Sequence, residues 1–156
     1  MITAIDTNIL LDILIPDETH SLSSKQLLDR CLEKGQLMIC EVVYAELSSQ
    51  FPSEKELKNF LFDTGIRFVP SSREVLYLAG ERWRKYARKR GRNIQCPSCG
   101  ERISIACPKC HQTVALRDRI LGDFIIGAHA FLHAELLLTR DRGFYHTYFK
   151  ELRIET

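Results

Sequence analysis

The sequence lacks any hydrophobic run that approaches the ~18 residues a membrane-spanning helix requires. It also lacks internal repeats and low-complexity segments. Its opening stretch, MITAIDTNILLDILI, has no basic segment of the kind that begins a secretory signal, and it carries acids at Asp6 and Asp12. We therefore expect a cytoplasmic globular protein with no membrane partner.

A strong excess of one charge is also missing. The chain has 22 Lys and Arg against 20 Asp and Glu, a formal net charge of +2. Whole-protein charge thus predicts no partner, and any affinity for nucleic acid has to come from a local patch. The candidate patch is RWRKYARKRGR, residues 82–92, in which seven of eleven residues are basic.

The 156 residues suit one domain, which at this size buries about 70% of the surface that its unfolded chain exposes. Short apolar segments alternate with longer amphipathic ones. We expect strands at 2–6, 37–40, 66–69, 135–139 and 152–155, and helices at 7–14, 21–34, 41–50, 53–65, 71–90, 119–133 and 143–150. Such alternation indicates a parallel sheet covered on both faces, an α/β/α sandwich.

Residues 92–117 interrupt the alternation, and we interpret them as an insertion within a single domain that spans residues 1–156. Two capping boxes mark helix starts on either side of the third expected strand. The first pairs Ser53 with Glu56 and the second pairs Ser71 with Glu74.

Four carboxylates occupy positions where the pattern expects burial. Asp6 closes the first strand and Asp141 follows the strand at 135–139, so both should emerge at the carboxyl edge of a parallel sheet, where open α/β folds bind ligands. Glu46 and Asp123 lie on the apolar sides of their helices. We expect all four to point inward and to meet.

Buried carboxylates that lie close together repel one another unless a cation stands between them. An all-oxygen cluster suits Mg²⁺ or Mn²⁺, and such sites hydrolyse phosphodiesters by activating water and stabilising the leaving oxygen. Asn8 and Thr139 lie beside Asp6 and Asp141 in the sequence and are candidate supporting groups.

Each acid taken alone has a plainer explanation. Asp6 could cap the helix that starts at the next residue, and Glu46 could pair with an arginine. Asp118 could replace Asp123, although Asp118 resembles the N-cap of the same helix, and Asp12 is expected to be solvated or ion-paired. Convergence of acids from separate elements favours a shared site over these separate explanations.

The stretches AIDTNILLD, VVYAEL, GDFIIGAHA and TRDRGFY, in this order, resemble the four motifs of PIN-domain ribonucleases, in particular the small VapC-like toxins. The resemblance covers residues 1–91 and 118–156. It implies a sheet of about five parallel strands, endonucleolytic cleavage of RNA with Mg²⁺ or Mn²⁺, and a homodimer. Where such a protein is a toxin, a small antitoxin occupies its acidic groove and inhibits it.

The resemblance also implies residue roles. The matching positions for the metal ligands are the four acids, with two polar residues in support. These are Asp6, Glu46, Asp123 and Asp141, supported by Asn8 and Thr139.

Two cysteine hooks, Cys96-x₂-Cys99 and Cys107-x₂-Cys110, lie in the insertion, which small VapC-like toxins ordinarily lack. Two such hooks complete a tetrahedral zinc site, and four thiolates leave no open position, so the predicted zinc is structural. The RISIA segment between them should form a compact hairpin. Iron is an alternative metal. Cys31 and Cys40 are expected to pack in the core.

The basic stretch forms one side of the helix at 71–90. We expect its inward stripe to comprise Leu76, Ala79, Trp83, Tyr86 and Ala87. The outward basic residues, predicted to contact RNA phosphates, are Arg84, Lys85, Arg88 and Lys89, continued by Arg92. His129 and His133 are expected to be packed or surface residues.

The sequence as a whole predicts a divalent-metal-dependent endoribonuclease that hydrolyses RNA phosphodiester bonds, either as the toxin of a toxin–antitoxin pair or in RNA processing. One alternative is a nuclease that acts on structured DNA. The other is a non-catalytic, zinc-containing module that binds RNA or protein.

Overall fold

Five short strands form the central sheet of the computed structural model, which describes residues 1–15, 19–89, 94–95, 102–114 and 121–156. They are β1 (Ile2–Ile5), β2 (Gln36–Ile39), β3 (Ile66–Phe68), β8 (Leu136–Leu138) and β9 (Ile154–Glu155), in the order β3-β2-β1-β8-β9. Every neighbouring pair is parallel, as predicted.

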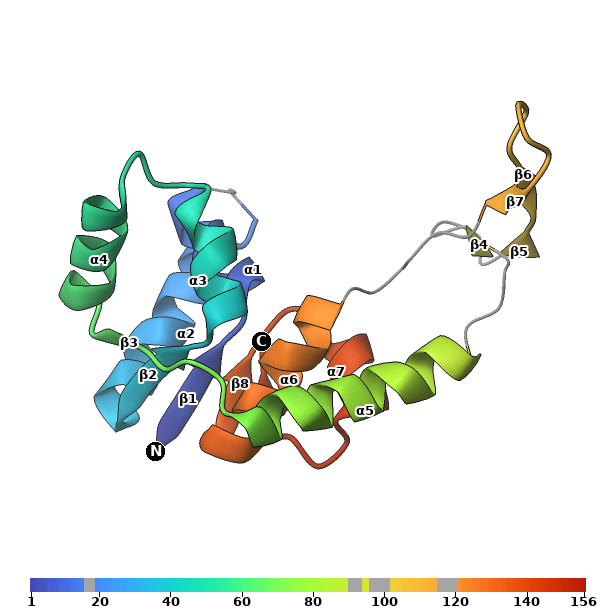
Figure 1. The fold of residues 1–156 in the computed structure, drawn as a ribbon. Coiled ribbons are helices and arrows are strands. Elements are labelled where there is room, and N and C mark those ends of the chain that lie inside the picture. The colour runs from blue at the N-terminus through green and yellow to red at the C-terminus, as the bar shows by residue number, and fades with distance from the viewer. Residues whose placement is uncertain (16–18, 90–93, 96–101, 115–120) are drawn as a thin grey trace.

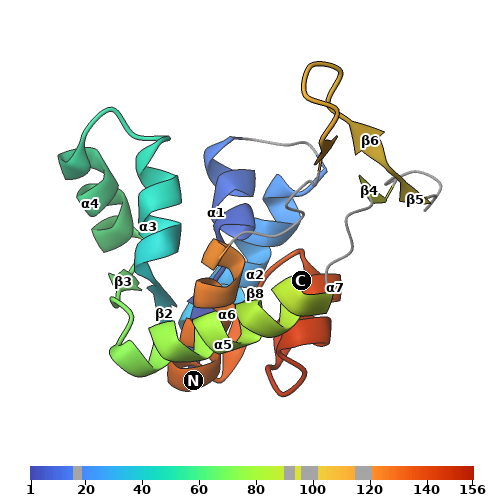
Figure 2. The same ribbon diagram turned by 45° about the vertical axis from the view of Figure 1, so that its right-hand side comes forward.

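Seven helices in the described part of the chain cover both faces of this sheet. They are α1 (Thr7–Leu14), α2 (Ser21–Lys34), α3 (Glu41–Ser48), α4 (Glu54–Asp63), α5 (Arg73–Lys89), α6 (Leu121–His133) and α7 (Arg142–Tyr148). α6 packs on β1 and β8 with α5 beside it, whereas α2 packs on β2 from behind (Figures 1 and 2). The predicted α/β/α sandwich is confirmed.

Burial on both sides explains why the central strands are continuously apolar. All three residues of β8 are buried, as are Ala4 and Ile5 of β1. The aromatic rings of Phe124 and Phe149 extend this core beneath α6 and α7. Gly127 admits the second ring, because a Cβ there would lie 2.4 Å from its Cε2 atom.

The predicted helix start at Ser53 is confirmed, since the Ser53 hydroxyl accepts the capping hydrogen bond from the Glu56 backbone N–H at 3.3 Å. The second prediction is wrong by one residue. α5 begins at Arg73, so Ser72 is its cap and accepts from the Val75 N–H at 3.4 Å.

The predicted inward stripe of α5 is partly wrong. Ala79 and Tyr86 are buried as expected, but Leu76 is 46% exposed and Trp83 is 36% exposed. The buried face is rotated toward Val75, because the helix packs mainly against α6, and its Tyr86 ring also contacts Tyr148 of α7. Ala87, also predicted to face inward, is exposed.

The insertion contains two small antiparallel hairpins. β4 (Ile94–Gln95) pairs with β5 (Arg102–Ile103), and β6 (Ile105–Ala106) pairs with β7 (Thr113–Val114). The RISIA segment therefore does not form a hairpin by itself, because its two halves pair with strands on the far sides of the two cysteine hooks. In Figures 1 and 2 the hairpins lie beyond the end of α5.

Several predictions fall on residues outside the described ranges, namely those for Arg92, Cys96, Cys99 and Asp118. Within the described ranges, no helix combines the length and the apolar character needed to cross a bilayer.

Candidate functional site

A cavity of about 390 Å³ opens at the carboxyl edge of β1, between α1, α3, α6 and α7. All four predicted acids line it. The lining residues are Asp6, Thr7, Asn8, Leu11, Glu46, Ser49, Gln50, Asp123, Asp141 and Tyr145. The structure thus brings together carboxylates that are up to 135 residues apart in the sequence, from Asp6 to Asp141.

Asp6 is the most deeply placed acid. Its backbone N–H continues the pairing of β1 with β8 by donating to the Leu138 carbonyl at 2.9 Å. Its Oδ2 accepts from Asn8 Nδ2 at 2.8 Å and from the Thr139 hydroxyl at 2.6 Å. The carboxylate accepts no capping hydrogen bond from the N–H groups that follow Thr7 in α1, so the alternative that Asp6 serves only as a helix cap is wrong.

Asp141 does cap a helix. Its Oδ1 accepts from the Phe144 N–H at 3.2 Å at the start of α7. Its own N–H donates to the hydroxyl of Thr139 at 3.0 Å. Because that same hydroxyl donates to Asp6, the fully buried Thr139 links the residues that carry two of the four acids.

Glu46 differs from the prediction that all four acids point inward. It is exposed, on the last turn of the short helix α3, whose buried residues are Val43 and Leu47. The side chain lies at the mouth of the cavity, where Glu46 Oε2 accepts from the Thr7 hydroxyl. Asp123, in the first turn of α6, is half-buried.

Burial raises the pKa of Asp6 from 3.8 to about 6. Removal of the carboxylate from water is the largest cause, and the negative charges of Asp123 and Glu46 raise it further. The hydrogen bonds from Thr139 and from the Thr7 backbone N–H oppose the rise. The acids therefore act on one another electrostatically across the cavity.

The donor set fits a hard divalent cation, since it consists of carboxylate oxygens with hydroxyl and amide groups behind them. In the described part of the chain, however, no three His, Cys, Asp or Glu side chains lie close enough to bind one metal ion as they stand. Repulsion between like charges opposes closer approach, and Glu46 and Asp141 are held by hydrogen bonds at the wall. A bound cation would have to draw the carboxylates inward.

Two residues of the cavity that hydrogen-bond to the acids, Tyr145 and Thr7, were not predicted from the sequence. The buried Tyr145 directs its hydroxyl to Asp6 Oδ2 at 3.4 Å, and burial followed by the charge of Asp6 raises the pKa of this phenol. Its position four residues after Asp141 on α7 is the only signal that the sequence carries. For Thr7 the sequence predicts only the start of a helix, and its hydrogen bond to Glu46 was not expected.

The remaining polar residues follow the plainer expectations. Asp12 is ion-paired, with its Oδ1 atom 2.9 Å from Arg140 Nη2. His129 is buried and its Nε2 lies 2.8 Å from the Val69 carbonyl, and the ring of the half-buried His133 meets the His129 ring in an edge arrangement. Cys31 and Cys40 are buried, as predicted.

The basic residues Arg84, Lys85 and Arg88 are exposed on α5, as expected. Lys85 Nζ pairs with Glu81 Oε1 at 2.8 Å. Tyr86, which lies between them, packs its ring 5.6 Å from that of Phe124, the neighbour of Asp123. This contact places the basic turn of α5 beside the start of α6.

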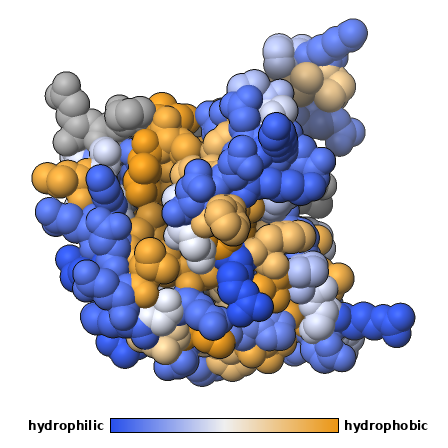
Figure 3. Space-filling view, turned by 90° about the vertical axis from the view of Figure 1, so that its left-hand side faces the viewer, coloured by the Kyte–Doolittle hydropathy of each residue, from blue (hydrophilic) through white to orange (hydrophobic). Residues whose placement is uncertain are grey.

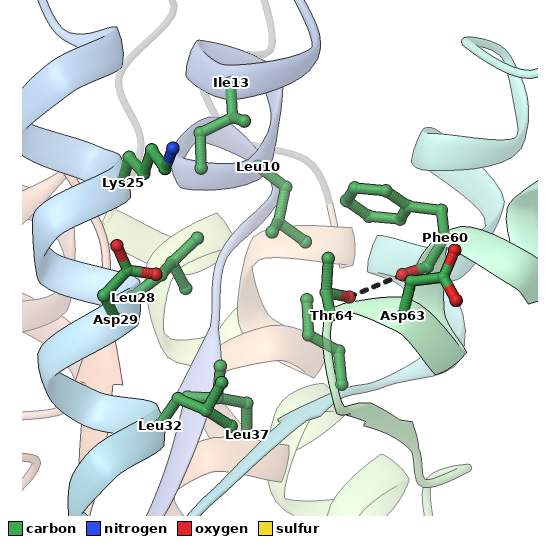
Figure 4. A pocket seen from close by; sticks show the side chains of 11 residues that line it. Leu10, Ile13, Lys25, Leu28, Asp29, Leu32, Leu37, Phe60, Asp63 and Thr64 are labelled. Carbon is green, nitrogen blue, oxygen red and sulfur yellow. Dashed lines mark hydrogen bonds between the residues drawn. The ribbon is translucent and has the colours of Figure 1, made fainter.

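A second, apolar cavity of about 320 Å³ lies on the other side of α1, and we call it the α1–α4 groove. Leu10 and Ile13 form one wall and Phe60 faces them from α4 (Figure 4). Lys25 and Asp29 of α2 stand at the rim (Figure 4). Viewed from this side, a band of hydrophobic residues runs between hydrophilic borders (Figure 3).

We expect Asp6 to make the metal-free protein less stable as the pH rises. The folded-state pKa of about 6 exceeds the ordinary value of 3.8, so the stabilisation by protonated Asp6 is complete below pH 3.8 and is lost as the pH rises through about 6. The loss amounts to about 3 kcal/mol. In urea unfolding with EDTA, the free energy of unfolding of Asp6→Asn should rise by this amount relative to the wild type as the pH increases from 3.8 to above about 6. A difference that does not vary with pH would contradict the assignment.

Comparison with known proteins places these features in a family. A model of the PIN domain matches residues 3–150. No curated protein matches the chain.

Three solved structures share the fold. VapBC2 from Rickettsia felis, bound to a promoter DNA fragment, has a TM-score of 0.61 at 18% identity, with 99% of this chain and 98% of that chain covered. VapBC-1 from nontypeable Haemophilus influenzae has a TM-score of 0.61 at 16% sequence identity, with 99% of this chain and 97% of that chain covered. FitAcB from Neisseria gonorrhoeae has a TM-score of 0.58 at 18% sequence identity, with 100% of this chain and 97% of that chain covered. The family model spans nearly the whole chain, and the protein therefore belongs to the PIN domain family.

Proposed function

We propose that the protein is a divalent-metal-dependent endoribonuclease that hydrolyses RNA phosphodiester bonds. The observation that carries the proposal is the single cavity lined by Asp6, Glu46, Asp123 and Asp141 at the carboxyl edge of a parallel sheet. Membership of the PIN domain family supports it.

In this proposal the four carboxylates hold Mg²⁺ or Mn²⁺. A bound ion would activate water and stabilise the leaving oxygen of the phosphodiester. The surrounding chain orients the ligands. Asn8, Thr139 and Tyr145 donate to the same oxygen of Asp6, which restricts rotation of its carboxylate, and Thr7 does the same for Glu46.

Substrate contact is assigned to the basic face of α5. Arg84, Lys85 and Arg88 are exposed beside the start of α6, and the proposed contact surface continues to Lys89 and Arg92. Positive side chains along this face would bind phosphates without reading the base sequence, so affinity should fall steeply with salt. The preference for RNA over structured DNA is part of the proposal, and matched RNA and DNA substrates of one sequence would test it.

Asp6→Asn should reduce RNA cleavage by about 100-fold or more, because the amide cannot supply the negative charge that a cation needs. Cleavage should also require added Mn²⁺ or Mg²⁺ and stop with EDTA. Glu33→Gln, an equally conservative change at an exposed position on α2, should leave the rate unchanged.

Cleavage that persists in Asp6→Asn would contradict the metal mechanism. A folded wild-type protein that binds RNA without cleaving any nucleic acid would instead favour the non-catalytic binding module.

We further propose that the protein acts as the toxin of a toxin–antitoxin pair, with RNA processing as the alternative role. The similar solved structures are named as VapBC and FitAcB assemblies. In this chain α1 lines both the acidic cavity, through Leu11, and the α1–α4 groove, through Leu10 and Ile13. An antitoxin segment with an apolar face could therefore be anchored in the groove while its end enters the acidic cavity. A homodimer is part of the same proposal.

Leu32→Lys should weaken binding of such an antitoxin by about 10-fold or more, because it places a charge at the edge of the apolar groove. Leu22→Lys on the same helix is the matched control, since Leu22 is 69% exposed and lies outside the groove. Binding to the product of a short gene immediately upstream can be measured by calorimetry. Equal affinities of the two variants would contradict docking in the groove, and the absence of such a gene would favour RNA processing.

The zinc site remains a proposal, with Cys96, Cys99, Cys107 and Cys110 as ligands and a structural role. The second hook, from Cys107 to Cys110, supports the proposal of a zinc site. It closes the β6–β7 hairpin, in which the N–H of Cys107 donates to the Gln112 carbonyl at 2.8 Å. Backbone N–H groups of Cys110 and Lys109 face the Cys107 sulfur and lower the pKa of this thiol, which favours the thiolate that zinc binds.

His111 supports the same interpretation. Its backbone has a φ of 56°, the left-handed conformation, directly after the second cysteine of its hook. The first hook has Gly100 at the matching position, the residue that adopts this conformation most readily. Both hooks therefore have a sequence compatible with one turn geometry.

The double substitution Cys107→Ser and Cys110→Ser should release about one zinc ion per chain and leave the sandwich folded, because the hairpins lie outside its core. Metal analysis of the purified protein and circular dichroism test the two parts. Retained zinc would contradict the ligand assignment. Loss of the sandwich fold would show that the insertion is not peripheral.

A further inference from the structure

One buried carboxylate lies outside the acidic cavity. Asp12 of α1 is 3% exposed, and both of its oxygens have partners. Oδ2 accepts from the hydroxyl of Ser24, itself buried on α2, at 2.7 Å. Oδ1 lies 2.9 Å from Nη2 of Arg140, whose side chain is 41% exposed. The ion pair thus ties the segment between β8 and α7 to α1.

Arg140 is held a second time by the same helix. Its backbone N–H donates to Asn8 Oδ1 at 3.1 Å. Asn8 and Asp12 are four residues apart, one turn of α1, so they present their side chains on the same face. Two contacts from one helical face therefore fix both the backbone and the side chain of Arg140.

Both sequence neighbours of Arg140 are connected to the acidic cavity, because Asp141 lines it and Thr139 contacts Asp6. Thr139 donates to Asp6 Oδ2 at 2.6 Å and accepts from the N–H of Asp141 at 3.0 Å. A displacement of Arg140 would therefore change the separation between Asp6 and Asp141.

We propose that Arg140 is a positioning residue, whose guanidinium, anchored on the buried Asp12, holds Asp141 beside Asp6 at the wall of the cavity, from which a divalent cation can draw both carboxylates onto itself. The inference rests on the proposed function, because it takes these acids to be cation ligands. It assigns Asp12, Ser24 and Arg140 to the support of the site, although none of them lines the acidic cavity.

Simple electrostatics predicts the opposite effect, which makes the proposal testable. Removal of a positive charge near a cation site strengthens cation binding if charge alone matters. Loss of a group that orients the ligands weakens it, typically by about 10–100-fold. Arg140→Met removes the charge and keeps the length of the stem. Combining it with Asp12→Asn restores the wild-type net charge and relieves the unpaired buried carboxylate.

The experiment is titration of each purified, RNA-free protein with Mn²⁺, followed by the electron paramagnetic resonance of the free ion. We expect the Kd for Mn²⁺ to rise about 10-fold or more both in Arg140→Met and in the Asp12→Asn/Arg140→Met double variant. Arg140→Lys should recover part of the affinity. The matched control is Arg30→Met, which breaks an exposed pair with Glu155 (3.6 Å between Nη2 and Oε1) and should bind as the wild type does.

Thermal unfolding in EDTA establishes whether each variant is folded. If Arg140→Met does not fold, the Asp12→Asn/Arg140→Met double variant provides the test. Affinity in both variants equal to or tighter than that of the wild type would overturn the positioning role and leave the proposed function standing. A wild type that binds Mn²⁺ no better than Asp6→Asn would overturn the proposed function and this inference with it.

Discussion

The parallel pairing of β1 with β8 is the contact on which the candidate site depends. It aligns the carboxyl ends of two strands that lie far apart in the sequence, so that Asp6 and Thr139 leave the sheet side by side. α1 and α7 begin at this edge, which brings Asn8 and Asp141 to the same place. Glu46 and Asp123 then approach from helices that pack around the edge.

This arrangement opposes the stability of the metal-free fold. A buried carboxylate facing other carboxylates holds its proton more tightly, as the raised pKa of Asp6 shows. The surrounding hydroxyl and amide donors offset part of the penalty without removing it. Asp12, a buried acid outside the cavity, is different, because its negative charge is neutralised by the guanidinium of Arg140. The contrast between Asp6, which has no cationic partner among the contacts of its carboxylate, and the ion-paired Asp12 supports the proposal that the cavity binds a cation.

Much of the fold, and the identity of the four acids of the candidate site, could be predicted from the sequence. The β-α alternation predicted the sheet and its helices, and the ends of two predicted strands placed Asp6 and Asp141 at one edge. What failed depends on tertiary packing. Side-chain periodicity placed Glu46 inward, whereas α3 buries Val43 and Leu47 and leaves Glu46 exposed at the cavity mouth. Periodicity also gave α5 a face that its contacts with α6 and α7 rotate away from Trp83. Tyr145 and the link from Asp12 to Arg140 join residues distant in sequence, and a single sequence carries no signal for such pairs.

The central claim is that the four carboxylates form one metal centre, and a crystal structure of the protein grown with Mn²⁺ tests it most directly. Anomalous scattering recorded near the manganese absorption edge should give a peak inside the cavity, with Asp6 and Asp141 among the ligands and the carboxylates closer together than in the structure described above. A cavity that stays empty while manganese binds elsewhere on the protein would contradict the account.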